Sequence, residues 1–406
     1  MESFLPVILG SDVNAYGIAR SIYERFHIKS VCLASAPLLM TESSQICSLR
    51  IRSEIHSLDG LKAALLELAN ETSYQQRIVF AASDEYAQLL IKLKRELSKY
   101  YKFPVPQAEI VDELVIKEKF YGLCDELNLP HPKTQIVTAY NYSKIDEVNF
   151  KYPIVVKPSN SVSFFKLHFH GKKKAYILKN EAELKDTLSL IYGTGYTDNL
   201  VIQEFVPGDD TNMRVVNTYI GQNHRVQAVS IGQPLLEDVT PELIGNYVAV
   251  KSVLGSSSII ETVKKLLEYV GYTGLADIDF KYDRRTNEYK IFDVNLRAGR
   301  SSYYTTLAGC NVIACAIDDL IYNNIQSQMV INSKDMLWLG VPAKVACQYI
   351  EDPALRQEAT KLIKEGHYGN TLCFSGDKGI KRNYRVHKYY KSYIGRFRDF
   401  FEEKGE

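Results

Sequence analysis

The sequence lacks the cysteine spacings that mark metal or redox sites. Its 406 residues include seven cysteines, and no two of them are separated by only two residues. Zinc-binding and dithiol motifs need such close pairs, so neither is predicted. Scattered thiols are typical of the reducing cytosol. The seven are Cys32, Cys47, Cys124, Cys310, Cys315, Cys347 and Cys373.

A leader sequence, long apolar runs and a dominant charge are also missing. The first twelve residues, MESFLPVILGSD, have neither a basic start nor a long apolar core, so they do not read as a secretory signal. No uncharged apolar run approaches the ~20 residues that span a bilayer. We therefore expect a cytoplasmic protein without stable membrane insertion. The formal net charge of +1 gives no reason to expect a nucleic-acid partner.

Strand and helix patterns alternate through the first hundred residues, which predicts a parallel, doubly wound sheet. The strand patterns lie at 6–9, 30–34 and 77–82, and the helical patterns lie at 15–26, 61–68 and 86–97. Ligands of such sheets bind beyond the carboxyl ends of the strands. The polar residues expected at that edge are Ser11, Asp12, Ser83, Asp84 and Glu85.

The middle of the chain contains further helix and strand patterns. Helices are predicted at 115–127, 180–191 and 257–270, and strands at 152–157, 167–169, 175–178, 200–205, 214–220 and 225–231. The segments 276–282 and 289–295 are predicted to form a hairpin around a polar turn.

This hairpin carries the most informative polar residues. Asp293 and Asn295 are two positions apart on a strand, so they share a face, which Arg297 continues. Asp279 lies on the partner strand. Two carboxylates and an amide oxygen form a site suited to Mg²⁺, which would bridge phosphate oxygens of ATP, assisted by Arg297 and Arg300. The alternative is an exposed hairpin with ordinary salt bridges.

Two lysines and a polar loop are candidate phosphate ligands. Lys157 ends a strongly apolar strand, where an ammonium can reach a phosphate, although such lysines often only extend into solvent. Lys117 begins a predicted helix. After Lys157, a loop with Ser159 and Ser161 can fold over phosphates through amides and hydroxyls, although it is not rich in glycine.

The segment 201–215 predicts a hinge, because a strand is followed by a tight Pro-Gly turn. Backbone groups of Glu204, Phe205 and Val206 are candidates to pair with the adenine edge, and Asp210 with the ribose hydroxyls. An acidic turn without that role is the alternative.

The last thirty residues are basic and aromatic. They suit contact with an anionic membrane or a nucleotide-bearing substrate. The alternative is a tail helix packed on its own domain. The residues are Lys378, Lys381, Arg382, Arg385, Lys388, Tyr389, Tyr390, Lys391, Tyr393, Arg396, Phe397, Arg398, Phe400 and Phe401.

In this order the candidates resemble the ATP-grasp superfamily. Its sequence of lysine, lysine, hinge acid, acid and acid-x-Asn-x-Arg is filled by Lys117, Lys157, Glu204 with Asp210, Asp279, and Asp293-Val294-Asn295-Leu296-Arg297. Asp293 replaces the Glu of many members, and the serine-rich loop replaces a glycine-rich one. The resemblance implies an α/β protein with α+β lobes. A Rossmann-like parallel-sheet lobe (1–112) precedes a small lid lobe (113–205), a large antiparallel-sheet lobe with the metal site (206–335) and a C-terminal extension (336–406).

A closer resemblance is to the D-aspartate ligases of peptidoglycan synthesis. It rests on stretches such as ILGSDVNAYGIAR, KFYGLCDELNLPHPKT, FVPGDDTNMRV, YTGLADIDFKYD and NLRAGRSS, which are spread over most of the chain. That family phosphorylates the side-chain carboxylate of D-aspartate and joins it to the ε-amine of lysine in UDP-MurNAc-pentapeptide, releasing ADP and phosphate. The resemblance implies that Arg297 holds phosphates, that Arg300 and Ser301 lie nearer the acyl phosphate, and that Asp12 and Asp84 face the amino acid or acceptor.

The resemblance also implies ATP and two Mg²⁺ ions as cofactors, with Mn²⁺ as a substitute, and a homodimer by analogy. Two other functions stay open at this point. One is another ATP-grasp carboxylate–amine ligase with different small-molecule substrates, which would share every nucleotide residue. The other is a nucleotide-sensing protein without turnover.

Overall fold

The computed structural model divides into two compact units. It describes residues 4–145, 148–160, 163–164, 167–243 and 245–402. The first unit comprises 1–108, 210–278 and 295–406, and the second comprises 109–209 and 279–294. The four-part division expected from the sequence stays a prediction, and each unit is described by itself below.

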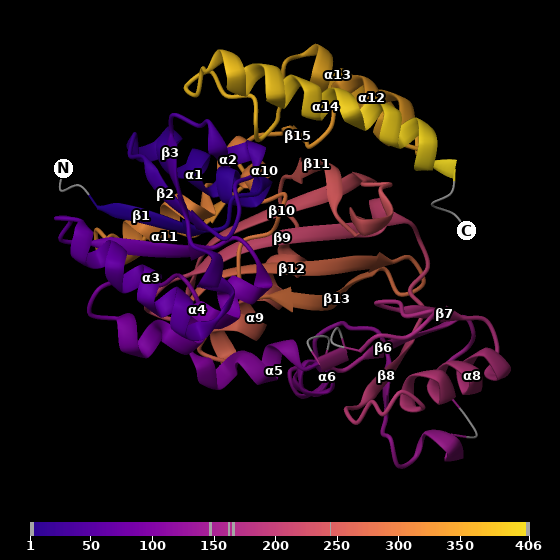
Figure 1. The fold of residues 1–406 in the computed structure, drawn as a ribbon. Helices are drawn as coiled ribbons and strands as arrows, with labels where there is room; N and C mark the ends of the chain where they lie inside the picture. Colours follow the sequence, from indigo (N-terminus) through magenta and orange to yellow (C-terminus); the bar gives the residue numbers. More distant parts are fainter. Residues whose placement is uncertain (1–3, 146–147, 161–162, 165–166, 244, 403–406) are drawn as a thin grey trace. The chain divides into compact units, whose positions relative to one another are not determined.

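The first unit begins with the predicted parallel sheet. Its strands β1 (Leu5–Leu9), β2 (Ser30–Ala34), β3 (Cys47–Ile51) and β4 (Arg77–Ala81) lie in the order β3-β2-β1-β4, and every pair is parallel. The connecting helices are α1 (Val13–Phe26), α2 (Leu39–Glu42), α3 (Leu58–Glu71) and α4 (Asp84–Leu97) (Figure 1). The alternating pattern therefore predicted this lobe correctly.

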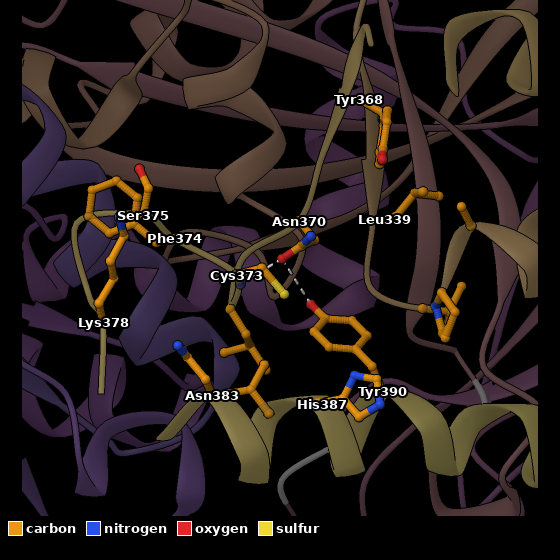
Figure 2. A pocket seen from close by; sticks show the side chains of 15 residues that line it. Leu339, Tyr368, Asn370, Cys373, Phe374, Ser375, Lys378, Asn383, His387 and Tyr390 are labelled. Carbon is orange, nitrogen blue, oxygen red and sulfur yellow. Dashed lines mark hydrogen bonds between the residues drawn. The ribbon is translucent and has the colours of Figure 1, made fainter. Parts of the chain in front are cut away.

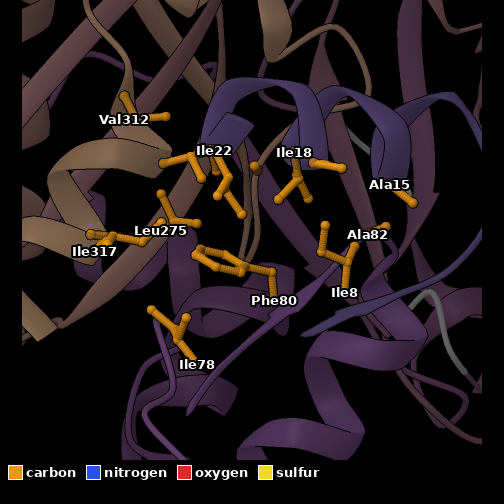
Figure 3. Close-up of a cluster of buried hydrophobic side chains, with 14 of the residues drawn as sticks. Ile8, Ala15, Ile18, Ile22, Ile78, Phe80, Ala82, Leu275, Val312 and Ile317 are labelled. Atoms are coloured by element: carbon orange, nitrogen blue, oxygen red, sulfur yellow. The ribbon is translucent and has the colours of Figure 1, made fainter. Parts of the chain in front are cut away.

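The parallel sheet shares its core with a strand and a helix from much later in the chain. Ile8, Ile22 and Phe80 are fully or almost fully buried in one cluster with Leu275 and Ile317 (Figure 3). At the carboxyl ends of β1 and β4, Asp12 and Ser83 cap α1 and α4 by accepting backbone N–H groups at 3.0 and 3.3 Å. The caps fix the polar residues beyond the strands in place.

A second sheet has eight strands in the order β13-β12-β9-β10-β11-β15-β16, with β14 beside β10. The strands are β9 (Met213–Ile220), β10 (Val226–Glu237), β11 (Tyr247–Val253), β12 (Gly274–Asp283), β13 (Glu288–Asn295), β14 (Val330–Ile331), β15 (Leu337–Leu339) and β16 (Tyr368–Gly369). The helices between them are α9 (Ser257–Tyr269), α10 (Tyr303–Leu307) and α11 (Val312–Leu320). The predicted hairpin is confirmed as β12 and β13.

The basic C-terminal segment forms a packed helix. α14 (Ile380–Phe400) contacts α12 (Ala343–Tyr349), and α13 (Pro353–Lys364) lies between them in sequence (Figure 1). Tyr393 and Phe397 of α14 are buried in an apolar cluster with Leu339 and Leu362. The packed tail helix, one of the alternatives from the sequence, is therefore confirmed. Within the described residues, no helix is both long and apolar enough to cross a membrane.

The second unit contains a small antiparallel sheet covered by a helix. β5 (Thr134–Val137), β6 (Ile154–Pro158), β7 (Tyr176–Leu178) and β8 (Leu200–Glu204) lie in the order β5-β8-β6-β7. The helices are α5 (Val111–Val115), α6 (Lys117–Glu126) and α8 (Glu181–Tyr192). Leu184, Leu188 and Ile191 of α8 pack with Ile154 and Val156 of the sheet.

One local prediction for this unit is confirmed and one was wrong. The helix expected at 115–127 is α6, which begins at Lys117 because Ile116 has an extended backbone, with φ −80° and ψ 112°. The strand expected at 167–169 is not formed. Leu167 and Phe169 instead pack as partly buried side chains against the apolar cluster of the small sheet. Their hydrophobicity thus reflects packing of a loop and not a strand.

Candidate active site

Lys117 and Asp293 form an ion pair in the second unit. The Lys117 Nζ lies 2.8 Å from both carboxylate oxygens of Asp293, and the lysine side chain is almost fully buried. Lys117 is held at the start of α6 by Ser159, whose carbonyl accepts the Lys117 N–H at 3.0 Å. The Ser159 hydroxyl also accepts the Glu118 N–H at 3.2 Å. Ser159 therefore caps α6 from the end of β6 and positions Lys117.

Lys157 lies within reach of the same charges. Burial and, next, the charge of Lys117 lower its pKa, Asp293 and Asp279 oppose both effects, and the net pKa is about 8. Its Nζ donates to Gln203 Oε1 at 3.3 Å. The structure thus brings together four of the residues predicted from the sequence, two lysines and two aspartates. Such a mixed cluster can exchange its internal ion pairs for phosphates and cations.

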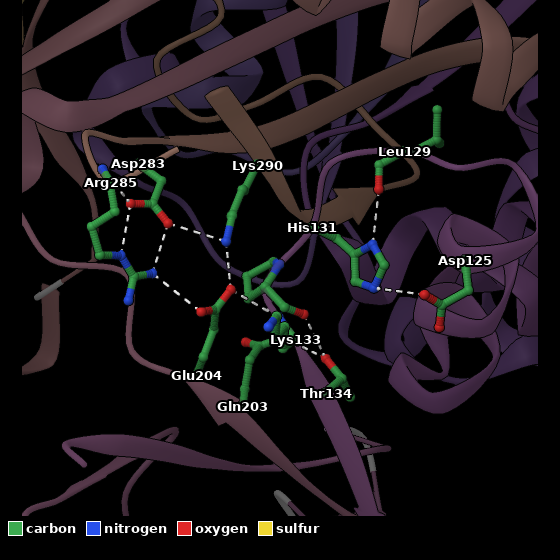
Figure 4. Close-up of polar contacts among 11 residues, drawn as sticks. Asp125, Leu129, His131, Lys133, Thr134, Gln203, Glu204, Asp283, Arg285 and Lys290 are labelled. Atoms are coloured by element: carbon green, nitrogen blue, oxygen red, sulfur yellow. Dashed lines mark hydrogen bonds and ion pairs between the residues drawn. The ribbon is translucent and has the colours of Figure 1, made fainter. Parts of the chain in front are cut away.

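The hinge acid Glu204 belongs to a second charged cluster, shown in Figure 4. Its carboxylate accepts from Lys290, from the Lys133 N–H at 3.0 Å and from Arg285 at 3.2 Å. Asp283 pairs with Arg285 at 2.6 Å and with Lys290 at 3.1 Å. Burial alone would raise the pKa of Glu204, but these hydrogen bonds and charges lower it below its usual value. Glu204 is therefore ionised and fixed.

One backbone group of Glu204 is also already hydrogen-bonded within the protein. The Glu204 N–H donates to the Lys133 carbonyl at 2.9 Å, so contacts with an adenine edge fall more readily to Phe205 and Val206. Val206 is buried, and the ring of Phe205 lies 5.7 Å from Lys281 Nζ. Sequence reasoning missed Asp283 and Arg285, because the loop 283–288 was interpreted only as a turn, and missed Lys290, which was interpreted only as part of a strand. The alternation of charges there was the available signal.

Two other predicted nucleotide ligands are placed differently. Ser161 lies outside the residues that the structure describes. Asp210 begins a short 3-10 helix, Asp210–Asn212, in the first unit, whereas Glu204 belongs to the second. Their roles stay predictions.

In the first unit, Arg297 is held between two carboxylates. Its guanidinium lies 2.9 Å from Asp84 and 3.4 Å from Asp277. Burial raises the pKa of Asp277 to about 6, against the opposing charge of Arg297. Asp277 also accepts from Asn217 Nδ2 at 2.9 Å. The two carboxylates orient the Arg297 guanidinium. A bound anion can pair with it only by displacing one of them.

The loop after β13 closes tightly onto Asp277. Asn295 Nδ2 donates to the Asp277 carbonyl at 3.4 Å, and the Gly299 N–H donates to Asn217 Oδ1 at 2.8 Å. A Cβ at Gly299 would lie only 2.7 Å from the Asp277 carboxylate, so the close approach requires glycine. Sequence reasoning chose Asp279 and missed Asp277, although both stand on one face of the same strand.

Asp12 and Arg300 also belong to the first unit. Burial raises the pKa of Asp12, while the Ala15 amide and the charges of Arg300 and Arg297 oppose the rise. Asp12 lines a pocket of about 220 Å³ with Ser11, Ser83 and Tyr86, at the carboxyl ends of β1 and β4. Ser301, which follows Arg300, is buried. The edge predicted to bind ligands is therefore hollow and charged.

The donor atoms for a cation come from few residues. Across the described part of the chain, no three or more His, Cys, Asp or Glu side chains gather as a metal site. Asp279 and Asp293 supply two carboxylates and Asn295 an amide oxygen, which are ligand types that Mg²⁺ accepts. The Asp293 carboxylate already holds one cation, the Lys117 ammonium. The residue types suit a magnesium ion, and their role as its ligands stays a prediction.

Comparisons with known proteins agree with this chemistry, although no family model matches the chain. The N5-carboxyaminoimidazole synthetase of Staphylococcus aureus has a similar structure, with a TM-score of 0.59, 14% identity and 86% coverage of both chains. The biotin carboxylase domain of Hydrogenobacter thermophilus 2-oxoglutarate carboxylase, solved with MgADP, ADP and bicarbonate, has a TM-score of 0.57 and 14% identity over 80% of this chain and 71% of that one. These similarities show the ATP-grasp fold.

The decisive similarity is in sequence. The chain is 37% identical to the D-aspartate ligase of Enterococcus faecium, over 99% of this chain and 98% of that protein. The predicted ATP-grasp residues lie within this span, and the fold matches the expected lobes. The chain belongs to the D-aspartate ligase family, whose members are ATP-grasp carboxylate–amine ligases that form an amide bond and release ADP.

Proposed function

We propose that the chain joins the β-carboxylate of D-aspartate to the ε-amine of lysine in UDP-MurNAc-pentapeptide. The observation that carries the choice of amino acid is the near full-length similarity to the E. faecium protein. The charged clusters around Lys157 and Arg297 support the chemistry. The reaction would release ADP and phosphate.

The chemistry proceeds in two balanced steps. A carboxylate oxygen of D-aspartate attacks the γ-phosphorus of ATP, and ADP leaves. The lysine amine then attacks the acyl carbon, loses a proton, and expels phosphate. Water must be excluded meanwhile, because it would hydrolyse the acyl phosphate. A lid formed by residues 130–205 would serve this purpose.

Lys117 and Lys157 would neutralise the phosphates of ATP. Asp279, Asp293 and Asn295 would hold Mg²⁺, with two ions as the expected number and Mn²⁺ as a substitute. A bound Mg²⁺ supplies charge compensation at the phosphate oxygens. Lys117 would leave Asp293 when ATP arrives, because both partners of that ion pair gain a stronger counter-charge.

Further roles are proposed from the sequence pattern and from the resemblance to the family. Phe205, Val206 and the fixed Glu204 would border the adenine, Asp210 the ribose, and Ser159 and Ser161 the phosphates. Arg297, oriented by Asp84 and Asp277, would contact phosphate. Arg300 and Ser301 would lie nearer the acyl phosphate, with Asp12 on the amino-acid or acceptor side.

The test is coupled ADP release by the purified chain with Mg-ATP, UDP-MurNAc-pentapeptide and a panel of D- and L-amino acids. We expect release only with D-aspartate, and a product heavier by one aspartyl residue. Release with a different amino acid would favour another carboxylate–amine ligase. Formation of AMP and pyrophosphate would overturn the acyl-phosphate route, and tight ATP binding without turnover would indicate a sensor.

A further inference from the structure

The first unit contains a large pocket, and none of its lining residues has been proposed above as a catalytic, nucleotide-binding or metal-binding residue. Its volume is about 650 Å³, and its lining includes Asn370, Phe374, Lys378, Asn383, His387 and Tyr390. We call it the C-terminal pocket (Figure 2). Lys117, Lys157 and Glu204, the expected ATP ligands, belong to the second unit. The C-terminal pocket is therefore built from a different set of side chains from the expected ATP site.

One end of the C-terminal pocket is lined by Lys378, at the beginning of a basic segment of the chain. From Lys378 to Arg398 the chain has eight lysines and arginines and no acidic residue, although the whole protein has a net charge of only +1. Lys378 is exposed at the start of α14. That helix has no side-chain cap and no acid in its first turn. Its first amides therefore add partial positive charge beside Lys378, which favours a phosphate group.

The other end presents aromatic rings. Figure 2 shows the rings of His387 and Tyr390 together on one side of the C-terminal pocket, with Lys378 and Asn383 toward the other. The Tyr390 hydroxyl donates to Asn370 Oδ1 at 3.4 Å, and the same oxygen accepts the Cys373 N–H at 2.7 Å. The Tyr390 side chain is thus held in place by its hydrogen bond to Asn370. Aromatic faces stack with nucleobases, whereas amines and helix amides hold phosphates.

The same helix leads toward the predicted catalytic residues of its unit. Tyr393 lies three residues, or about one helical turn, beyond Tyr390. Burial raises the pKa of the Tyr393 hydroxyl, and the charge of Arg300 partly opposes the rise. A ligand held in the C-terminal pocket would therefore contact the same helix that carries Tyr393.

We propose that the C-terminal pocket binds the nucleoside diphosphate end of the acceptor. The pyrimidine ring would stack with Tyr390 and His387, and the diphosphate would bind Lys378 and the first amides of α14. This inference rests on the proposed function, which requires a nucleotide-bearing acceptor. The acceptor's reacting amine is on its peptide, so its nucleotide can occupy a site separate from the one where the amine reacts.

The first experiment measures binding without turnover. UDP is titrated calorimetrically into the full chain while Mg²⁺ and a non-hydrolysable ATP analogue fill the ATP site. We expect one UDP per chain, and about tenfold weaker binding for Lys378→Ala and for His387→Ala, as for loss of one strong contact. Lys391→Ala is the matched control, because Lys391 is an exposed lysine of α14 that does not line the pocket. Its binding should be unchanged.

No UDP binding, or an equal loss in Lys391→Ala, would overturn the proposal. Equal affinity of the wild-type chain for UDP and ADP would also overturn it, because the pocket would then not select the base of the acceptor. Binding of vesicles made of anionic phospholipid that the two pocket variants abolish, with no effect on UDP, would assign the basic helix to a membrane surface instead.

The second experiment measures kinetics. Lys378→Ala and His387→Ala should raise KM for UDP-MurNAc-pentapeptide about tenfold at unchanged kcat, with the KM values for ATP and D-aspartate unaffected. An acceptor without UDP should be used equally by wild type and variants. An unchanged acceptor KM alongside lost UDP binding would show that the pocket holds a free nucleotide, against the proposal. If the chain shows no turnover with D-aspartate, the proposed function fails, whereas the UDP titration still decides whether the pocket binds a nucleotide.

Discussion

At the scale of single residues, Lys157 has a protonation state that changes near neutral pH. Its folded pKa of about 8 lies below the usual lysine value of 10.5, because its ammonium is buried beside Lys117. The cation that binds phosphate is therefore present below pH 8 and lost above it. We predict that kcat/KM for ATP falls by about tenfold per pH unit well above pH 8. A pH–rate profile of the free enzyme checks this.

Two variants separate this explanation from general loss of activity at high pH. Lys157→Arg should keep its cation, so the decline near pH 8 should disappear whatever its absolute rate. Lys157→Met should lose ATP affinity yet unfold at a higher temperature at pH 7, because the folded chain no longer buries a charged ammonium. A decline near pH 8 that persists in Lys157→Arg would assign the titration to a different group.

Single residues also show how far sequence reasoning reaches. Lys157, Asp279 and Asp293 were predicted from strands and Lys117 from the start of a helix, and the structure brings their charges together. The ion pair between Glu204 and Lys290 joins residues 86 positions apart. Such a pair depends on tertiary packing, which periodicity does not reveal.

At the scale of elements, the basic tail helix α14 is held by its apolar face. Phe397 is fully buried among Leu339, Val345 and Leu362, whereas Ile394, on the same helix, is exposed. We predict that Phe397→Ala lowers the free energy of unfolding by about 3–5 kcal/mol, because it removes a core ring and leaves a cavity. Ile394→Ala should change it by less than about 0.5 kcal/mol. Chemical denaturation of both variants checks this.

A loss in Phe397→Ala no larger than in Ile394→Ala would mean that α14 is not docked in solution. Arg382 offers a reason to expect docking, since it pairs with the buried Asp377 at 2.7 Å and stacks over Tyr16 at 4.3 Å. Sequence reasoning anticipated this helix from its aromatic stripe at helical spacing. It also anticipated the helix expected at 115–127, which is α6, but not the extended backbone of Ile116 that separates α6 from α5.

At the scale of the whole molecule, the chain passes between its two units four times, and two passages lie within β12 and β13. The segment Asp293-Val294-Asn295-Leu296-Arg297 contains one of these passages. A predicted metal ligand and the predicted phosphate ligand Arg297 therefore lie in different units but only four residues apart. The sequence motif predicted that the metal ligand and Arg297 are close in the chain. The alternation of the two units along the chain became evident only from the structure.

Ligand binding should consequently stabilise the molecule through Mg²⁺ and ATP together. Asp293 carries a lysine as its internal counter-ion, and a metal must replace it before the carboxylate can serve phosphate binding. We predict that ATP at a hundred times its Kd with Mg²⁺ stabilises the fold by about 2.7 kcal/mol. Removing Mg²⁺ with EDTA should remove most of that gain and abolish ADP release. Asp293→Asn should lose the Mg²⁺-dependent part of the thermal shift, while Asp399→Asn, an exposed change on α14, should retain it. A full thermal shift with ATP and EDTA would show that the carboxylates do not act through a metal, and would return Asp293 to a purely structural partner of Lys117.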